Sequence, residues 1–478
     1  MTSMKKQILL IITAFSILQS CSNVNSNKAE QLPVEISNAD SKASCVFLTK
    51  DEKNNPVISW TEIDKAEKKH FFFANWDNKS LGFGDKISIP IDSITSIHEE
   101  GMPKIAFKGD GTLVATYETS VPSPTSKFGL SNILYIMSFD KGKTWTTPKS
   151  IKTNLQEGSC SFGNIIKLSD GELGASWLGT NSDKSIMGRP VMFAKTKGKD
   201  GFGDAIEIEP SACQCCRTAL SCDENGNVSL VFRNLLSGSV RDISVSNSSD
   251  NGGSFNKAIP FSNDNWVIDG CPHNGPSVVK NSKGTYVSWF TGSKNKGVFY
   301  AELDANNKML EKHQLSSNGR FAQLCLTPDG NRVIAFNSHY RVGDSLYNKI
   351  MVIKKNEKGY FEKEVTIPKT HASYPVIQSL DEQNVVIAWT DNEKVYYKFL
   401  NINDIKIQFE EEVTQPASEN VFISLPKLDF KNDPVCGMMV NNKSSADTTL
   451  SNGKIVGFCS ENCKDIFIKN PSSYTIKK

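Results

Sequence analysis

Seven short strand-like runs, spaced about fifty residues apart, constrain the fold of this chain more than any other feature. Most of them follow a tight-turn dipeptide such as Asp110-Gly111 or Asp329-Gly330, so each unit reads as strand, turn, alternating apolar strand and polar loop. Self-similarity at this period over about 350 residues predicts an all-β chain, a β-propeller with one blade per repeat. The runs are Pro56–Trp60, Thr112–Thr116, Glu172–Trp177, Asn227–Phe232, Thr285–Phe290, Asn331–Phe336 and Asn384–Trp389.

The 478 residues divide into five expected segments. We expect a signal peptide over 1–20, a tether over 21–44, the propeller over 45–407, a linker over 408–430 and a small cysteine-containing module over 431–478. Lys and Arg number 54 against 52 Asp and Glu, a formal net charge of +2. This balance gives no electrostatic reason to expect a nucleic-acid partner.

The N-terminal segment resembles a bacterial lipoprotein signal. Two lysines precede an apolar run from Ile8 to Leu18, and Leu18-Gln-Ser-Cys21 matches a lipobox, so the resemblance implies that Cys21 is lipidated. The alternative is a plain secretory signal with an incidental cysteine. Ser22, rather than Asp, follows Cys21, which by the same resemblance favours the outer membrane. We therefore expect an outer-membrane lipoprotein, facing the periplasm or the cell surface, with the membrane as partner through its lipid.

Two repeats carry an Asp-box pattern, Ser-x-Asp-x-Gly-x-Thr/Ser-aromatic, at Ser138–Trp145 and Ser248–Phe255. The pattern resembles the Asp boxes, or BNR repeats, of sialidase-like propellers. That resemblance implies that the Asp and Gly shape a hairpin turn and that the aromatic ring packs between blades, a structural role. Sialidase-type propellers usually have six blades, so six remains possible here beside the favoured seven. The residues assigned to this role are Asp140, Gly142, Trp145, Asp250, Gly252 and Phe255.

The C-terminal module is closely similar to the YHS domain, which accompanies heavy-metal transport and copper-handling proteins. The similarity lies in Asp433–Met438, Gly457–Phe467 and Asn470–Tyr474, over about 45 residues. It implies an association with metal and does not choose the metal. Residues 431–478 contain no histidine, so a site here would use sulfur alone or borrow a ligand.

Three cysteines of this module are candidate metal ligands. Cys459 and Cys463 are four residues apart, which on a helix places both sulfurs on one face, and Cys436 on the preceding turn would supply a third thiolate. Soft sulfur ligands favour copper(I) or zinc(II) over hard cations. A disulfide that leaves the third cysteine free is the alternative.

Cysteines and histidines of the propeller recur at one position of the repeat. Cys160, Cys215 and His273 each lie eleven residues before the turn glycine of their repeat, and Cys213 and Cys271 lie thirteen before theirs. Equivalent positions are related by rotation about the propeller axis, so these groups should ring one end of the central channel and converge as a metal site requires. Cys216 adjoins this set, and His98, Cys45 and His371 fall near the same place.

Two other readings of these residues stay open. Cys213 or Cys216 could pair with Cys271 or Cys160 and staple adjacent blades by disulfides, or the cysteines could have no role. Outside the set, Cys222 and Cys325 are expected to be core thiols, and three histidines are expected to be solvated: His70, His313 and His339.

A sialidase is the obvious enzyme hypothesis. That resemblance implies three arginines that grip a carboxylate, a Tyr nucleophile activated by a Glu, and an Asp acid/base. The first family arginine lies in an Arg-Ile-Pro motif near the start of the propeller, whereas the first arginine of this chain is Arg189. A bidentate clamp needs guanidinium groups, and the chain has only seven arginines.

The function favoured by the sequence is metal handling by an exported lipoprotein, which binds copper or zinc at the propeller mouth and in the YHS module and acts with other metal-handling proteins. Arg217, directly after Cys216, would lower the pKa of a neighbouring thiol and favour the thiolate. An exo-sialidase or other glycoside hydrolase, a redox enzyme and a disulfide-stapled protein-binding propeller remain alternatives. We expect a binding protein rather than an enzyme.

Overall fold

The structure is a computed structural model. It describes residues 32–409 apart from 125, 153–157, 269 and 344, and, further on, 428, 430, 432–435, 440, 447–451, 454–458, 463–464, 467–468 and 471–474. The expected signal peptide, the lipidation residue Cys21, most of the linker, and Cys436 and Cys459 lie outside these residues. None of the helices in the described ranges has the length and the apolar composition needed to span a membrane.

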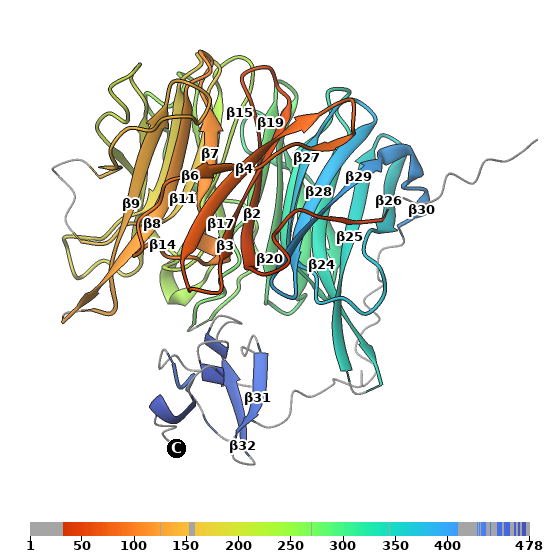
Figure 1. Cartoon of the computed structure of the whole chain (residues 1–478). Helices are drawn as coiled ribbons and strands as arrows, with labels where there is room; N and C mark the ends of the chain where they lie inside the picture. The colour runs from red at the N-terminus through yellow and green to blue at the C-terminus, as the bar shows by residue number, and fades with distance from the viewer. Residues whose placement is uncertain are drawn as a thin grey trace, which may run out of the picture. The chain divides into compact units, whose positions relative to one another are not determined.

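Seven antiparallel sheets form the blades of a β-propeller, so the favoured blade number is confirmed (Figure 1). Short 3-10 helices are η1 (Glu99–Gly101), η2 (Ser237–Ser239), η3 (Ile402–Asp404) and η4 (Pro471–Ser473). Blades 1 to 3 hold β2 (Lys42–Lys50), β3 (Pro56–Ile63), β4 (Lys69–Asp77), β5 (Gly82–Phe83) and β6 (Ile87–Ile89); β7 (Lys104–Phe107), β8 (Leu113–Ser123), β9 (Ser126–Ser138) and β10 (Lys149–Ser150); and β11 (Ser161–Lys167), β12 (Leu173–Leu178), β13 (Arg189–Lys195) and β14 (Ile206–Ala212).

The remaining blades repeat the same order from the axis outward. Blades 4 and 5 hold β15 (Ala219–Cys222), β16 (Val228–Arg233), β17 (Ile243–Ser248) and β18 (Ile259–Pro260), then β19 (Ser277–Asn281), β20 (Gly284–Thr291), β21 (Gly297–Leu303) and β22 (Met309–Ser316). Blades 6 and 7 hold β23 (Gly319–Leu326), β24 (Arg332–Val342), β25 (Ser345–Asn356), β26 (Gly359–Glu364) and β30 (Ile407–Gln408), then β27 (Ser373–Ser379), β28 (Asn384–Asp391), β29 (Lys394–Asn401) and β1 (Val34–Glu35).

Apolar side chains fill the space between neighbouring blades. Seven buried clusters each combine residues of two adjacent blades, so every blade is covered on both faces. This explains why the central part of the second strand of each blade is buried and rich in apolar residues, as in sheets covered on both sides. The largest buried side chains include one tryptophan at the same place in four second strands: Trp60, Trp177, Trp289 and Trp389.

The ring closes through a strand from the start of the chain. β1 pairs antiparallel with β29, with Val34 opposite Tyr397. Lys394 fixes the following turn, because its Nζ donates to the carbonyls of Asn38, Ala39 and Ser41 at 2.8, 2.6 and 2.8 Å. The segment 21–44, expected as a tether, thus contributes β1 and the first residues of β2 to the propeller from Val34 onward. An outermost strand needs few apolar residues, so its composition looks like that of a linker.

The two Asp boxes are hairpin turns, as their resemblance implied. In the second box the Asp250 carboxylate accepts from the Ser254 N–H at 2.9 Å, the Ser254 hydroxyl at 2.8 Å and the Ser248 hydroxyl at 2.6 Å. These hydrogen bonds hold the pKa of Asp250 down, at about 2. Asp140 makes the equivalent bonds in the first box with Ser138 and Thr144.

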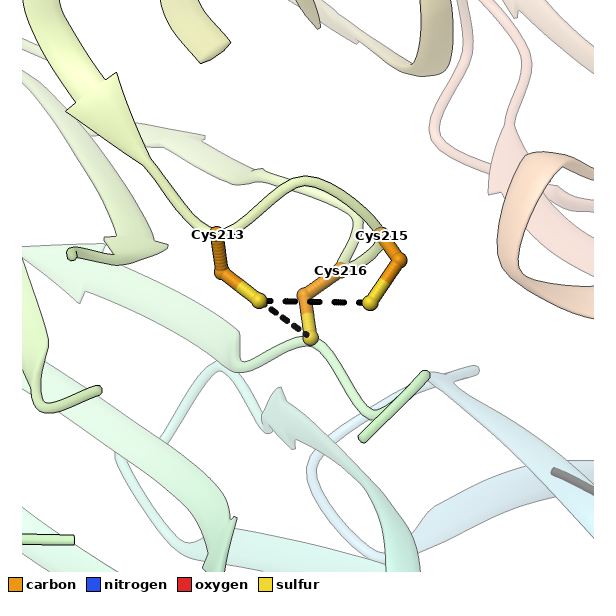
Figure 2. A group of neighbouring side chains, drawn as sticks. All are labelled: Cys213, Cys215 and Cys216. Atoms are coloured by element: carbon orange, nitrogen blue, oxygen red, sulfur yellow. Dashed lines mark hydrogen bonds between the residues drawn. The ribbon is translucent and has the colours of Figure 1, made fainter. Parts of the chain in front are cut away.

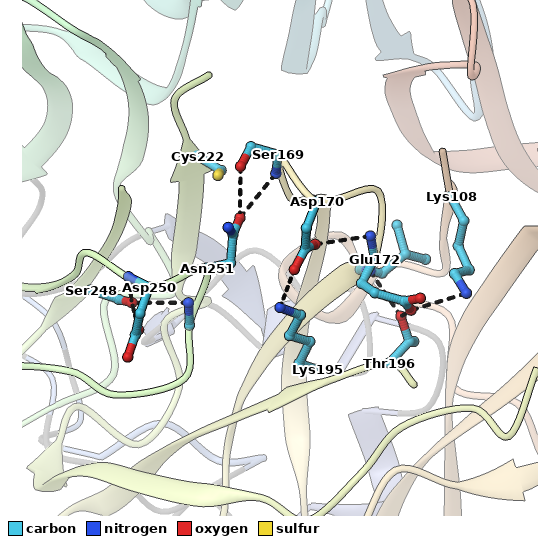
Figure 3. Close-up of polar contacts among 12 residues, drawn as sticks. Lys108, Ser169, Asp170, Glu172, Lys195, Thr196, Cys222, Ser248, Asp250 and Asn251 are labelled. Atoms are coloured by element: carbon cyan, nitrogen blue, oxygen red, sulfur yellow. Dashed lines mark hydrogen bonds and ion pairs between the residues drawn. The ribbon is translucent and has the colours of Figure 1, made fainter. Parts of the chain in front are cut away.

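The boxes also connect blades. Phe255 packs in the cluster between blades 3 and 4, with its ring 4.9 Å from that of Phe193, and Trp145 packs in the cluster between blades 1 and 2. Figure 3 shows Asn251 of the second box reaching blade 3, where its Oδ1 accepts from the Ser169 hydroxyl at 2.9 Å and the Ser169 N–H at 3.2 Å. The aromatic and the turn thus fix the angle between neighbouring blades.

The C-terminal module has a hairpin of β31 (Asp447–Ser451) and β32 (Lys454–Phe458). A small core forms from apolar residues of this module alone: Phe430, Val440, Val456, Phe458, Cys463 and Phe467.

Candidate metal centre

Three cysteines gather in the loop that leads from blade 3 into blade 4. Cys213 follows β14 directly, and its N–H donates to the Arg233 carbonyl at 2.8 Å, which fixes the start of the loop against blade 4. Cys215 and Cys216 follow before β15 begins at Ala219. Figure 2 shows the three sulfurs turned toward one another.

The sulfur atoms are close and buried. The Sγ of Cys213 lies 3.9 Å from that of Cys215 and 3.8 Å from that of Cys216, and all three Sγ atoms lie within 4.8 Å of one another. Cys271, from the loop before blade 5, packs against them in a four-cysteine cluster beside Phe162. The eight cysteines of the propeller are all free thiols in the structure, so the disulfides considered from the sequence between Cys213 or Cys216 and Cys271 or Cys160 are not formed here.

An arginine that sequence reasoning missed contacts these thiols. Arg241 donates from Nη1 to the Cys213 sulfur at 3.0 Å. Hydrogen bonds with Cys215 and Cys216 hold the pKa of Cys213 well below its usual range, against the effect of burial, and the charges of Arg241 and Arg233 add to this. Burial instead raises the pKa of Cys215 and Cys216, so Cys213 is the thiol of the three whose ionisation is favoured.

Arg217 does not act on the thiols as its place in the sequence suggested. It forms a buried ion pair with Glu100, whose Oε2 also accepts from the backbone N–H groups of Arg217 and Gly275, both at 3.1 Å. The ion pair joins the loop before blade 2 to blades 4 and 5. Arg217 is thus a structural residue of the channel mouth, where the innermost strands begin.

The repeat position inferred for Cys160, Cys215 and His273 is the same in the strand pairing. Four residues after each of them comes a residue of the innermost strand: Asn164, Ala219 and Ser277. These pair with Ser176, Val231 and Ser288, each of which directly precedes an aromatic residue of the second strand. The cysteines and the histidine are therefore at one height of the propeller.

Their side chains do not all meet. The Cys160 sulfur accepts from the Ile133 N–H at 3.2 Å and lies 3.4 Å from the Asn132 Oδ1, within the cluster of blades 2 and 3, away from the three-cysteine group. The Nδ1 of His273 lies 3.2 Å from the Cys271 carbonyl oxygen, and burial lowers its pKa. The expected convergence holds for Cys213, Cys215, Cys216 and Cys271, and it is wrong for Cys160.

Bulges explain why equal height does not mean equal direction. The innermost strands of blades 1, 3, 6 and 7 each contain a register shift at a non-glycine residue in the left-handed region. A bulge turns the chain so that its side chains point elsewhere than the alternation predicts. The residues are Cys45 (φ 58°), Phe162 (φ 60°), Phe321 (φ 54°) and Tyr374 (φ 49°).

An acidic group at η1 is a second feature that sequence reasoning missed. His98 caps η1, with its Nδ1 accepting from the Gly101 N–H at 3.0 Å, and its Nε2 lies 3.5 Å from the Glu118 carboxylate. Glu99 accepts from the Cys45 N–H at 3.0 Å and the Thr390 hydroxyl at 3.2 Å. The sequence did contain a signal for this group: His98 lies at the repeat position of the other mouth residues, and Glu99 and Glu100 follow it directly.

The other predicted residues lie apart from the mouth group. Cys325 is a core thiol and Cys222 is half-buried, and His371 is exposed beside Tyr347. The three histidines expected to be solvated are partly exposed, and each also has a polar neighbour: His70 Nε2 lies 2.8 Å from Asp64, His313 Nε2 lies 3.2 Å from Glu311, and His339 Nδ1 lies 2.5 Å from Asn348. In the C-terminal module Cys463 is buried in the small core.

Arginines that a sialidase would need are committed elsewhere. Arg233 is buried and donates to the carbonyls of Arg241, Asn274 and Phe290, while Arg217 is paired with Glu100. These guanidinium groups do not form an open clamp for a carboxylate.

Family models match most of the chain. The BNR repeat-like domain matches residues 47–387 and the YHS domain matches residues 432–477. No curated protein matches.

The solved structures to which the chain is similar are distant in sequence. A polysaccharide lyase, an ulvan lyase bound to a glucuronate–sulfated rhamnose unit, is 10% identical, with 77% of this chain and 96% of that one covered at a TM-score of 0.51. The NanB sialidase from Streptococcus pneumoniae is 9% identical (79% and 71% covered, TM-score 0.45), and a protein of unknown function from Dyadobacter fermentans is 14% identical (63% and 93%, TM-score 0.42). The chain therefore belongs to the BNR repeat-like family, and it carries a YHS domain at its C-terminal end.

Proposed function

We propose that this protein binds a thiophilic metal ion, copper(I) in preference to zinc(II), through Cys213, Cys215 and Cys216, and that it acts in metal handling. One observation carries the proposal: three buried cysteines of one short loop have their sulfurs within 4.8 Å of one another. Buried thiols in such a group are soft ligands, which select copper(I) and zinc(II) over hard cations.

The spacing of the sulfurs fits a bound ion. For a metal–sulfur distance of about 2.3 Å, two sulfurs are about 3.8 Å apart in a tetrahedral site and about 4.0 Å apart in a trigonal one. The two measured separations from Cys213 are 3.9 and 3.8 Å. Cys271, in the same cluster, is the available fourth ligand for a tetrahedral ion.

The surroundings suit the charge of a thiolate site. Three thiolates and a copper(I) ion together carry two negative charges, which are costly to bury without compensation. Arg241 contacts the Cys213 sulfur, and Arg233 and Arg189 lie close enough to the cysteines for their charges to interact. Three of the seven arginines of the chain thus surround the group, which supports a buried anionic cluster.

The YHS domain gives a second cysteine-containing module to the same chain. In this proposal Cys436, Cys459 and Cys463 bind the same class of ion, and the ion passes between the two modules or to other metal-handling proteins. Lipid on Cys21 would hold the protein at the outer membrane. Mass spectrometry of the mature protein tests the anchor, because Cys21→Ser would lose the lipid mass.

The metal proposal is tested on full-length protein purified without oxygen. We expect copper(I), titrated against a coloured chelator, to bind tightly at the propeller, and Cys213→Ser and Cys216→Ser each to remove that equivalent. Cys222→Ser is the matched control, since its half-buried sulfur lies outside the group. An unchanged copper stoichiometry in the Cys213 and Cys216 variants would refute the site. Full oxidation of the native thiols would instead support a protein-binding scaffold.

A further inference from the structure

The central channel of the propeller holds a cavity of about 410 Å³, which is lined by residues from the innermost strands of all seven blades. Among its lining residues five are basic and none is acidic. Two of the five, Arg217 and Lys104, lie near the mouth, where Arg217 is paired with Glu100. The other three are Lys50, Lys167 and Lys280.

These three lysines occupy one position of the repeat. Each pairs with the residue of the second strand that lies four positions before the buried tryptophan of that strand (Trp60, Trp177 or Trp289). The three lysines therefore lie at one height, at the end of the channel opposite the mouth. They come from blades 1, 3 and 5, which places them around the axis. The cross-strand pairs are Lys50 with Pro56, Lys167 with Leu173 and Lys280 with Thr285.

Within the described part of the chain, the hydrogen-bond acceptors of the three ammonium groups are neutral oxygens. Lys50 donates to the Ser379 hydroxyl at 3.0 Å, Lys167 to the Asn54 Oδ1 at 3.5 Å and Lys280 to the Thr285 hydroxyl at 3.1 Å. An ammonium has three donors, so each retains capacity for further hydrogen bonds. Burial lowers the pKa of Lys50 and of Lys280; the charge of Lys167 adds to this effect at Lys50, and the charge of Asp223 opposes it at Lys280.

Blade 2 has a lysine one residue beyond this position, and that lysine has an internal partner. The equivalent of Lys167 in blade 2 is Phe107, which pairs with Leu113. The next residue, Lys108, does not line the cavity and forms an ion pair with Glu172 at 2.9 Å (Figure 3). Its Nζ also donates to the Gly198 carbonyl at 2.7 Å. This lysine outside the cavity therefore has a carboxylate as partner, whereas the three lysines that line the channel donate to neutral oxygens.

Asp223, the acidic side chain that acts on one of these lysines, already accepts hydrogen bonds within its own turn. Asp223 acts on the charge of Lys280, but its carboxylate accepts from the N–H groups of Asn225 and Asn227 and from the Asn227 side chain, at 3.0, 2.8 and 2.8 Å. It holds its own turn and does not enter the cavity lining.

We propose that the far end of the channel binds a small oxyanion, of the class of inorganic phosphate or sulfate, between Lys50, Lys167 and Lys280. The site is separate from the cysteines of the mouth and does not depend on them. Three ammonium groups arranged around an axis can each donate to a different oxygen of such an anion, with charge-assisted hydrogen bonds.

The test uses full-length protein and inorganic phosphate, titrated by calorimetry at constant ionic strength with chloride as the balancing anion. We expect the wild type to bind phosphate at millimolar concentrations or below, and Lys280→Met to weaken binding about tenfold, because one charge-assisted hydrogen bond is lost. Methionine keeps the apolar stem of the lysine. The triple change of Lys50, Lys167 and Lys280 to Met should abolish binding.

Lys184→Met is the matched control. Lys184 is exposed in the β12–β13 connection at the mouth end of blade 3, so the change removes the same charge elsewhere and should leave phosphate affinity unaltered. Parallel titrations with sulfate and acetate separate a doubly charged oxyanion from a carboxylate.

Phosphate affinity equal to that of the wild type in the Lys280→Met variant would overturn the proposal, as would a wild type that binds phosphate no better than chloride. The single variant keeps the test valid if the triple variant does not fold. Copper binding should be unchanged in all the lysine variants, so a failed metal site and a failed anion site give different results.

Discussion

Glu99 provides a sharp test of the electrostatics at the channel mouth. Its Oε1 accepts from the Cys45 N–H and the Thr390 hydroxyl, but its Oε2 is buried without a partner among the described residues. Burial raises the pKa of Glu99 from 4.5 to about 7, against the opposing effect of those hydrogen bonds. The change Glu99→Gln keeps the size of the side chain and an acceptor for both donors while it removes the charge.

The sign follows from proton linkage. A carboxyl whose folded pKa lies above its unfolded pKa binds more protons in the folded state, so its contribution to the free energy of unfolding falls as the pH rises from about 4.5 to about 7. A difference of about 2.5 pH units corresponds to about 3 kcal/mol in total. Between about pH 5 and pH 8, Glu99→Gln should therefore gain about 2 to 3 kcal/mol relative to the wild type.

Urea unfolding followed by tryptophan fluorescence measures this, because all seven tryptophans lie in the propeller. The difference in unfolding free energy between variant and wild type is compared across pH, so that other titrating groups cancel. Glu224→Gln, in the exposed turn before β16, is a control that should show a flat difference. A flat difference for Glu99→Gln as well would show that Glu99 is solvated and that the description of the mouth is wrong.

Two further predictions concern a thiolate and a turn. In reduced, metal-free protein, Arg241→Met should raise the pKa of Cys213, since a hydrogen bond to a charged group contributes about 1.5 to 3 kcal/mol; thiolate absorbance in the ultraviolet should then titrate at higher pH, and an unchanged titration would refute the role of Arg241. Gly252 and Gly330 both have φ above +80°, but a Cβ at Gly252 would lie 2.5 Å from the Phe193 ring, whereas at Gly330 it would meet nothing within 4 Å. Gly330→Ala should cost about 1 kcal/mol from backbone strain alone, and Gly252→Ala clearly more in the same urea assay; equal losses would contradict the packing of the Asp box between blades.

The repeat architecture was predictable from sequence because it is local. Each blade is a series of hairpins, so a turn glycine and an apolar run such as Thr285–Phe290 suffice to locate it. The same period gave the height of Cys215 and His273 along the axis, which the strand pairing shows.

The directions of side chains at the mouth were not predictable in this way. Bulges at Phe162 and its equivalents turn the innermost strands, and Cys160 points into a blade interface. The partners of Cys213 and Arg217 are Arg241 and Glu100, which lie 28 and 117 residues away in the chain. Pairs of this kind arise from packing among blades, and no periodicity within one sequence reveals them. The edge strand β1 escaped prediction for a related reason, because its partner is the last blade.

The pairing of β1 with β29 has a consequence for the order of folding. Val34 and Tyr397 are separated by roughly 360 residues, and the entropic cost of closing a loop of that length is about 5 kcal/mol beyond its constant part, against about 2 kcal/mol for a ten-residue hairpin. Single blades should thus form before the ring closes, starting with the N-terminal blades as the chain is synthesised. Until Lys394 is available, blade 1 has no neighbour on one side, and the polar composition of residues 37–41 limits association of that open edge with other chains. Closure is then the final step, and the cysteine loop between blades 3 and 4 is already in place when it occurs.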